Sequence, residues 1–251
     1  MNFEINIKEK NFINKLDNSK INVLKNIDIK INSKEFVCIV GPSGCGKTTL
    51  MNIIGGLISA DKQNIKLNGK TRKDIEENIS YVFQSSRLLP WLTVRENIEL
   101  VSQKKTNIEG DINDLLNNFG LSEFIDFYPK AISGGMRRKV SLARALINKP
   151  SILLMDEPFV SLDQPTSENL YDVLINYWKM KPITIILITH SLKEALLLSD
   201  RILFFSKKPG TVVFDYKVKS NRNPLNVDNK NVSAEYNNLK KKYPKILGGI
   251  V

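Results

Sequence analysis

The sequence has few of the residues on which metal clusters, disulfides and membrane spans depend. One histidine, His190, and two cysteines, Cys38 and Cys45, stand among 251 residues. One cysteine lies in an apolar run and the other in a glycine-rich loop, so we expect two reduced thiols rather than a disulfide. The apolar runs "SILLM" and "ITIILI" are too short to span a bilayer. Because "MNFEINIKEK" lacks the apolar centre of a signal peptide, we expect a soluble protein without a secretory signal.

The charge of the chain is basic and unevenly distributed. The formal net charge is +11, and residues 207–251 supply +7 of it. A basic tail could meet nucleic acid or an anionic membrane surface. A solvated and partly mobile terminus explains the same composition more simply, and we expect that. The length fits one large domain, or a domain with a subdomain, around a sizeable core.

Hydrophobic periodicity divides the chain into two kinds of strand and several helices. Residues 3–13 and 21–31 alternate apolar and polar side chains, which is typical of antiparallel strands. Continuous apolar runs predict strands that are buried on both faces: "EFVCIV", "SILLMD", "ITIILIT" and "RILFFS". The stretch "NISYVFQ" predicts another strand. Helical patterns fill residues 86–147, 164–179 and 191–199. The sequence therefore predicts an α/β core that is interrupted by a helical insertion.

The stretch "GPSGCGKT" predicts a phosphate-binding loop. It has the spacing G-x-x-x-x-G-K-T from Gly41 to Thr48, after a predicted strand and before a predicted helix. Glycines let backbone N–H groups approach phosphate oxygens, and the helix N-terminus attracts the same anion. We expect Lys47 to neutralise the β- and γ-phosphates and the Thr48 hydroxyl to bind Mg²⁺. A plain glycine-rich turn does not require all of this spacing. The expected nucleotide-binding residues are Gly41, Pro42, Ser43, Gly44, Cys45, Gly46, Lys47, Thr48 and Thr49.

Polar residues follow three of the predicted strands. Asp156 and Glu157 end "SILLMDE", His190 ends "ITIILITH", and Gln84 ends "ISYVFQ". Ligands of parallel sheets gather at such strand ends. We expect Asp156 and Gln84 to bind the metal, and Glu157 to orient and deprotonate the attacking water. Gln84 is also a candidate catalytic residue, because its amide can reach the metal or its water. We expect His190 to sense the γ-phosphate by a hydrogen bond. Without the phosphate loop, an acidic surface turn and a surface histidine would be the ordinary interpretations.

A second anion site is predicted at "ISGGMRR". Ser133, Gly134 and Gly135 precede a long predicted helix, so their backbone would face an anion at a helix N-terminus. One nucleotide in one chain does not need two sites for its γ-phosphate. A head-to-tail dimer does, because each chain then completes the other's site.

These motifs, in this order, resemble the nucleotide-binding subunit of an ABC transporter. The resemblance covers about residues 1–215 and assigns the Walker A loop to 41–48, the Q-loop to Gln84, the signature to 133–136, the Walker B strand to 152–157 and the switch histidine to His190. It implies a RecA-like P-loop NTPase core with an N-terminal antiparallel β subdomain and a helical subdomain inserted at about 86–147. Residues 216–251 are then a basic C-terminal tail.

The same resemblance implies the ligands and partners. We expect ATP and Mg²⁺, a homodimer, transmembrane permease subunits and, through them, a solute-binding protein. The expected location is the cytoplasmic face of the membrane. Binding of nucleic acid is not expected.

Three further stretches of the sequence resemble the nitrate/sulfonate/taurine importer branch. They are "RLLPWLTVRENI", "SGGMRRKVSLARAL" and "SKKPGTVVFDYKV". Importers of thiamine and riboflavin precursors look similar, so the solute stays open. The resemblance also implies an adenine-stacking aromatic, for which Phe12 is the candidate beside the apparent insertion "NKLDNSK". Lys34 and Val160 depart from the usual pattern, but no catalytic position is lost.

Two alternatives remain within the wider family. The first is a soluble ATPase of DNA repair or translation, which the net charge of +11 makes worth considering. The absence of a sustained heptad pattern and the presence of one cassette rather than two speak against it. The second is an exporter or lipid-extraction ATPase, against which the "LPWLTVREN" and "KKPGTVV" marks speak.

Overall fold

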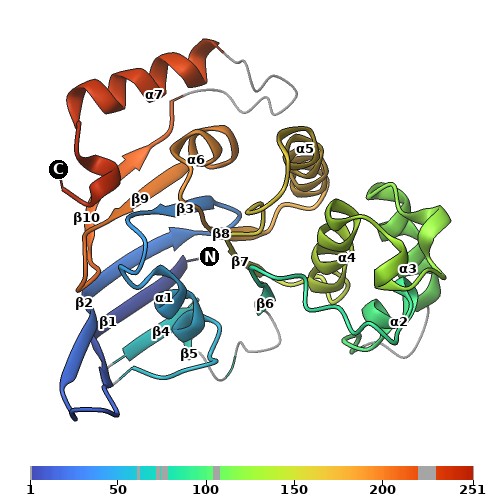
Figure 1. Cartoon of the computed structure of the whole chain (residues 1–251), viewed down its shortest axis with the longest axis horizontal. Coiled ribbons are helices and arrows are strands. Elements are labelled where there is room, and N and C mark those ends of the chain that lie inside the picture. Colours follow the sequence, from blue (N-terminus) through green and yellow to red (C-terminus); the bar gives the residue numbers. More distant parts are fainter. Residues whose placement is uncertain are drawn as a thin grey trace.

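The computed structural model describes residues 2–60, 63–71, 74, 79–103, 108–219 and 230–250. A mostly parallel sheet forms the centre of the molecule. Its strand order is β10-β9-β3-β8-β7-β6, and only β10 runs antiparallel to its neighbour. The strands are β3 (Phe36–Val40), β6 (Ile79–Val82), β7 (Ile152–Asp156), β8 (Thr184–Ile188), β9 (Arg201–Phe205) and β10 (Val212–Lys217). The predicted strands β3, β6, β7, β8 and β9 are therefore confirmed, and β6, at the edge of the sheet, is only partly buried (Figure 1).

A second, antiparallel sheet has the order β2-β1-β4-β5. Its long strands, β1 (Asn2–Ile13) and β2 (Lys20–Asn32), are the antiparallel pair that the alternating pattern predicts. The short strands β4 (Gln63–Leu67) and β5 (Lys70–Thr71) extend the sheet. The sequence did not predict these two strands.

The central sheet is buried on both faces because its strands alternate between two cores. Phe36, Cys38 and Val40 of β3 point to one core, and Val37 and Ile39 point to the other. The second core also holds α1 (Lys47–Ile54) and the inner face of the antiparallel sheet. Helix α1, which begins at the phosphate loop, is thus packed between the two sheets (Figure 1).

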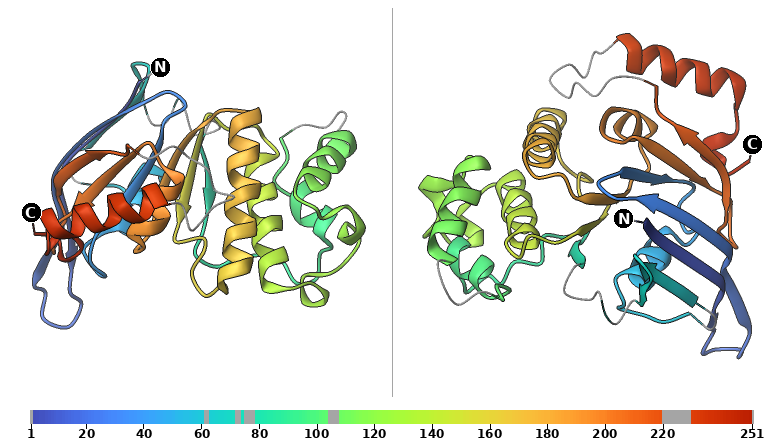
Figure 2. Two further views of the ribbon diagram at one scale, coloured as in Figure 1. Left: turned by 90° about the horizontal axis from the view of Figure 1, so that it is seen from above. Right: turned by 180° about the vertical axis from the view of Figure 1, so that it is seen from behind.

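The helical insertion lies between β6 and β7 and forms a lobe at one side of the molecule (Figures 1 and 2). It contains α2 (Val94–Glu99), α3 (Ile108–Asn118), the short helices η2 (Ser122–Phe124) and η3 (Pro129–Ala131), and α4 (Gly134–Leu146). Thr93 starts α2 with a reciprocal capping box to Glu96. The predicted insertion is confirmed, although residues 104–107 of it lie outside the described residues.

Two further helices match their predictions and cover the first core. Helix α5 (Gln164–Met180) begins after Asp163 with a proline in its first turn. Helix α6 (Leu192–Leu198) begins after Ser191, whose hydroxyl accepts a hydrogen bond from the Glu194 backbone. These helices pack on the face of the sheet opposite α1.

The expectation of a solvated tail is wrong for residues 230–250. They contain helix α7 (Lys230–Lys242) and the turn η4 (Ile246–Gly248), which bury Val232, Leu239 and Ile246 in the first core. The high net charge of this segment suggested a solvated tail, although its few apolar residues have the spacing of a helix with one buried face. Strand β10 also continues through the expected boundary at residue 215. Residues 220–229 and 251 of the expected tail lie outside the described residues.

A hydrogen bond joins this terminal helix to β10. The Tyr216 hydroxyl donates to Glu235 Oε1 at 2.6 Å, and the Lys219 backbone donates to the same oxygen at 2.8 Å. Burial raises the pKa of Tyr216, and the Glu235 carboxylate adds to the increase. The tyrosine therefore stays a neutral donor at neutral pH.

Truncating Leu239 tests whether α7 is part of the cooperative fold. Leu239 is 4% exposed, so Leu239→Ala is expected to lower the free energy of unfolding by about 2–4 kcal/mol. Urea denaturation with the exposed-site variant Asn238→Ala as control measures this. Equal stability of the two variants would show that α7 does not contribute to the core.

Candidate functional site

Four parallel strands deliver the candidate residues to one edge of the sheet. The phosphate loop follows β3, Gln84 follows β6, Asp156 and Glu157 end β7, and His190 follows β8. A groove of about 370 Å³ opens there. It is lined by Val23, Ser43, Gly44, Gly46, Lys47, Thr48, Thr49, Gln84, Glu157 and Lys208. Residues as far apart in sequence as Lys47, Gln84 and Glu157 thus meet, as the strand order predicts.

The phosphate loop needs glycine at two turns. Gly44 has a φ of +74° and Gly46 a φ of +109°, which side chains disfavour. A Cβ at Gly46 would also lie 2.8 Å from Leu24 Cδ2. Gly46 caps α1 without a side-chain hydrogen bond, so the helix presents its first backbone N–H groups to the groove. This arrangement fits an anion.

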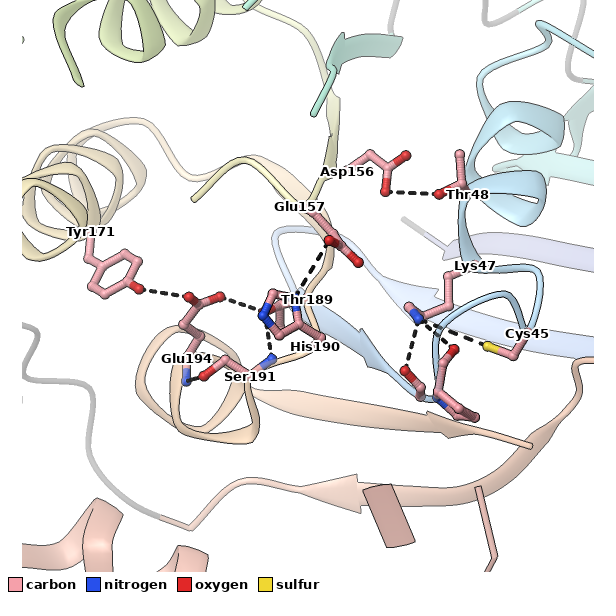
Figure 3. Close-up of polar contacts among 12 residues, drawn as sticks. Cys45, Lys47, Thr48, Asp156, Glu157, Tyr171, Thr189, His190, Ser191 and Glu194 are labelled. Atoms are coloured by element: carbon pink, nitrogen blue, oxygen red, sulfur yellow. Dashed lines mark hydrogen bonds and ion pairs between the residues drawn. The ribbon is translucent and has the colours of Figure 1, made fainter. Parts of the chain in front are cut away.

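Lys47 bends back over the loop from which it comes (Figure 3). Its side chain is buried, and Nζ donates to the carbonyl oxygens of Gly41 at 2.8 Å and Pro42 at 3.0 Å. Nζ is 4.0 Å from Cys45 Sγ, and burial raises the pKa of that thiol. Cys45 and Cys38 are both buried and are not joined by a disulfide.

Thr48 and Asp156 bring two hard oxygen donors together. Thr48 Oγ1 donates to Asp156 Oδ1 at 3.3 Å, and Asp156 is buried (Figure 3). Burial raises the pKa of Asp156; the nearby Glu157 charge acts in the same direction, while the Thr48 hydrogen bond and Lys47 oppose it. The Thr48 hydroxyl and the Gln84 amide line the groove, and the Asp156 carboxylate is hydrogen-bonded to Thr48. This set of oxygen donors fits Mg²⁺, which takes oxygen ligands.

Glu157 and His190 face each other across the end of the sheet. Glu157 Oε2 and His190 Nδ1 are 3.5 Å apart. A dashed line marks this contact in Figure 3. The Glu157 backbone has a φ of +45°, and its N–H donates to the Ile188 carbonyl at 3.0 Å. The side chain of His190 is 62% exposed and that of Glu157 is 24% exposed. Both groups can therefore reach a ligand in solvent.

A buried hydrogen-bond network supports the segment that carries His190. Thr189 Oγ1 donates to one carboxylate oxygen of Glu194, and the Tyr171 hydroxyl donates to the other at 2.9 Å. The Ser191 backbone donates to Thr189 Oγ1 at 3.0 Å. The sequence analysis missed these residues, because Tyr171 and Glu194 look like ordinary members of amphipathic helices.

The loop that contains Gln84 is held by helix α4. Arg138 donates to the Phe83 carbonyl at 3.1 Å, and Arg144 donates to the carbonyls of Ser86 at 2.9 Å and Arg87 at 2.8 Å. Burial lowers the pKa of both α4 guanidinium groups. The helical lobe is thus fastened to the groove through main-chain atoms.

Some predicted residues lie away from the groove. Ser133 caps α4, accepting a hydrogen bond from the Met136 backbone at 3.2 Å, with Gly134 and Gly135 in the first turn. None of the three lines the groove. Phe12 lies near the end of β1, 42% exposed, and does not line it either.

The groove also contains two residues that the sequence analysis did not assign. Val23 comes from β2, and Lys208 comes from the loop between β9 and β10. Val23 carries no sequence signal. Lys208 belongs to "KKPG", which was considered only as a mark of the importer branch.

Comparison with known proteins identifies the family. The family model described as ABC transporter matches residues 24–160, which include the phosphate loop, Gln84, the Ser133 turn and Glu157. This chain belongs to the ABC transporter family. An aliphatic sulfonates import ATP-binding protein of Bacillus cereus is 41% identical over 205 residues, 81% of this chain and 80% of its own length. A taurine import ATP-binding protein of Ruegeria pomeroyi is 37% identical over 80% of this chain and 76% of its own length.

Solved structures of the family share the fold. A dimeric ATP-binding cassette in a post-hydrolysis state, bound to ADP and Pi, has a TM-score of 0.75 and 29% identity, covering 87% of this chain and 100% of that chain. The expected ABC ATPase fold is therefore confirmed. No helix in the described ranges of this family member is long and apolar enough to cross a membrane.

Proposed function

We propose that this chain is the ATP-binding and ATP-hydrolysing subunit of an ABC importer for a small solute of the sulfonate or taurine type. The observation that carries the proposal is the convergence of Lys47, Thr48, Gln84 and Glu157 in one groove beside Asp156. Relatives that are import proteins for aliphatic sulfonates and taurine support the solute class.

The phosphate loop binds the ATP phosphates. Backbone N–H groups at the start of α1 and the Lys47 ammonium face the β- and γ-phosphates. Lys47 exchanges its bonds to the Gly41 and Pro42 carbonyls for phosphate oxygens or shares its three protons between them. The remaining residues of 41–49 shape this cradle.

Thr48, Asp156 and Gln84 are the proposed holders of Mg²⁺. When bound, the ion neutralises phosphate charge and makes the γ-phosphorus more electrophilic. Asp156 must be ionised for this role. Because burial raises its pKa, binding of the cation and the Lys47 charge would favour the carboxylate again.

Glu157 and His190 are the proposed catalytic pair. Glu157 orients a water molecule for in-line attack on the γ-phosphorus and takes its proton, as the bond to the ADP oxygen breaks. His190 donates a hydrogen bond to the γ-phosphate and so registers its departure. The hydrogen bonds among Tyr171, Thr189 and Glu194 fix the backbone segment that contains His190.

A second copy of the chain completes the site. Ser133 and Gly135 of the partner would bind the γ-phosphate held by Lys47, which gives two composite sites in a two-fold dimer. ATP would then bind the closed dimer better than the separated chains. Hydrolysis would remove this shared ligand and allow the two chains to separate. A dimeric cassette among the structural neighbours supports this arrangement.

The dimer would act on permease subunits at the cytoplasmic face of the membrane. We propose that the helical lobe, which is bonded to the Gln84 loop, transmits the closing and opening of the dimer to the permease. Trp91 is 69% exposed at this lobe and is available to a permease helix. The exporter and the soluble ATPase are less well supported, because the similar curated proteins are import subunits.

Solute-stimulated hydrolysis tests the proposed function. The chain is assembled with its permease and binding protein in vesicles, and ATP hydrolysis is measured with an alkanesulfonate, taurine, nitrate and pyrimidine precursors. We expect stimulation by an alkanesulfonate or taurine. Stimulation by none of these solutes would refute the assignment to this importer branch.

The first turn of α4 gives a test of the composite site. A Cβ at Gly135 would lie 2.3 Å from Thr166 Cγ2, so Gly135→Ala must displace the α4 N-terminus or Thr166. We expect ATP hydrolysis to fall about 10- to 100-fold with little change in ATP binding by single chains. Adding Thr166→Ser removes the clashing methyl and should restore part of the rate.

The control for this experiment is Gly248→Ala, whose Cβ would meet no atom within 4 Å. Steady-state hydrolysis and ATP titration of all four proteins are compared. Wild-type hydrolysis by Gly135→Ala would contradict a place for this glycine in the composite site.

A further inference from the structure

Lys208 brings a second lysine into the groove. It lines the same space as Lys47 and Thr48 but comes from the loop of residues 206–211, between β9 and β10. Lys208 is exposed, so its ammonium is free to meet a ligand from solvent. The preceding residue, Lys207, is also exposed but does not line the groove.

The loop that carries Lys208 is fastened to both sheets. The Gly210 N–H donates to the Val23 carbonyl at 2.8 Å, and the Lys25 N–H donates to the Gly210 carbonyl at 3.0 Å. Ser206 closes the loop on itself, donating its N–H to the Thr211 carbonyl at 2.9 Å. Lys208 is thus carried by a braced turn, which limits the entropy lost when it binds a ligand.

The same loop lies directly against the phosphate loop. A Cβ at Gly210 would be 2.3 Å from the Cys45 carbonyl oxygen, so only glycine fits there. Gly41 touches the base of this loop as well, since a Cβ there would lie 2.8 Å from Phe205 Cβ. The two loops therefore keep a fixed spacing.

The strand order places Lys208 opposite the hydrolytic residues. Strand β9 flanks β3 on one side, and β8, β7 and β6 follow on the other. The phosphate loop after β3 consequently lies between Lys208, on the β9 side, and Glu157 and Gln84, on the β7 and β6 side. If Glu157 contacts the γ-phosphate, Lys208 contacts a part of the nucleotide that is farther from the γ-phosphate.

From this placement we propose that Lys208 is a nucleotide-binding residue, which contacts the portion that ATP and ADP share, on the α- and β-phosphate side. The inference rests on the proposed ATPase function. Lys208 lies on the side of Val23, where β2 enters the groove. It contributes to affinity for both nucleotides and does not take part in the cleavage step.

Nucleotide titration of Lys208→Ala tests this role. We expect the dissociation constants of ATP and ADP to rise by a similar factor, about three- to tenfold, because the attraction of an exposed cation is partly screened. The factor should shrink when salt is raised. At subsaturating ATP, hydrolysis by the full-length protein should fall in proportion to the lost affinity, because Lys208 acts on nucleotide binding.

Two matched variants separate a specific contact from a general charge effect. Lys207→Ala removes the same charge one residue away and should bind both nucleotides like wild type, whereas Lys208→Arg should keep most of the affinity. Thermal unfolding of each variant checks the fold. An equal loss in Lys207→Ala, or unchanged binding in Lys208→Ala, overturns the inference; a wild-type protein that binds no ATP overturns the proposed function instead.

Discussion

Glu157→Gln is expected to bind ATP, to accumulate as a dimer and to hydrolyse almost nothing. The amide keeps the size and hydrogen-bonding reach of the carboxylate but cannot take a proton from water. Loss of a general base costs about 10²- to 10⁴-fold in rate. Because the ATP that joins the two chains is no longer removed, the closed dimer should persist. Phosphate release and size-exclusion chromatography with light scattering measure the two effects.

The control for this variant is Glu123→Gln, which removes an exposed carboxylate in the helical lobe. It should hydrolyse ATP within twofold of wild type and show no ATP-dependent excess of dimer. A near-normal turnover number for Glu157→Gln would refute its role as base. The 3.5 Å contact with His190 would then be a structural contact only.

Lys47→Met is expected to lose ATP binding about 100-fold. Methionine keeps most of the apolar stem at a site that is 6% exposed but removes the ammonium that would face the phosphates. Hydrogen bonds between charged partners contribute about 1.5–3 kcal/mol, and every 1.4 kcal/mol changes affinity tenfold. Isothermal titration of ATP in the presence of Mg²⁺ measures the loss.

The same substitution has a second, separable consequence. The carbonyls of Gly41 and Pro42 lose a donor, so we expect the free energy of unfolding to fall by about 1–3 kcal/mol without nucleotide. Urea denaturation with and without ATP distinguishes the two effects. ATP should stabilise the wild type and leave Lys47→Met unchanged. Equal stabilisation of both proteins would contradict the phosphate role of Lys47.

The parts of the fold and the site that depend on consecutive residues were predictable from the sequence. A five-residue apolar run such as β3 or β8 is buried on both faces, and its period is visible without any knowledge of its neighbours. The phosphate loop was predictable for the same reason, because all its residues are consecutive. Since parallel strands end at one edge, the meeting of Lys47, Glu157 and Gln84 followed from those two facts.

Features that depend on distant contacts were not predictable. Lys208 reaches the groove because Gly210 pairs with Val23 and Lys25, which lie in the N-terminal strand β2, far away in sequence. The anchoring of α7 depends on packing against the first core, whereas its sequence shows mainly charge. Adenine stacking by Phe12 and the composite role of Ser133, Gly134 and Gly135 stay predictions.

Two of the arginines of α4 determine how the Gln84 loop can vary. Arg138 and Arg144 grip only carbonyl oxygens of residues 83–87, and every amino acid supplies such an oxygen. The side chains of Ser85 and Ser86 take no part in these bonds and are therefore free to be exchanged to suit a different permease. The mechanical connection between lobe and groove would survive those exchanges, so one motor design can serve many transport partners.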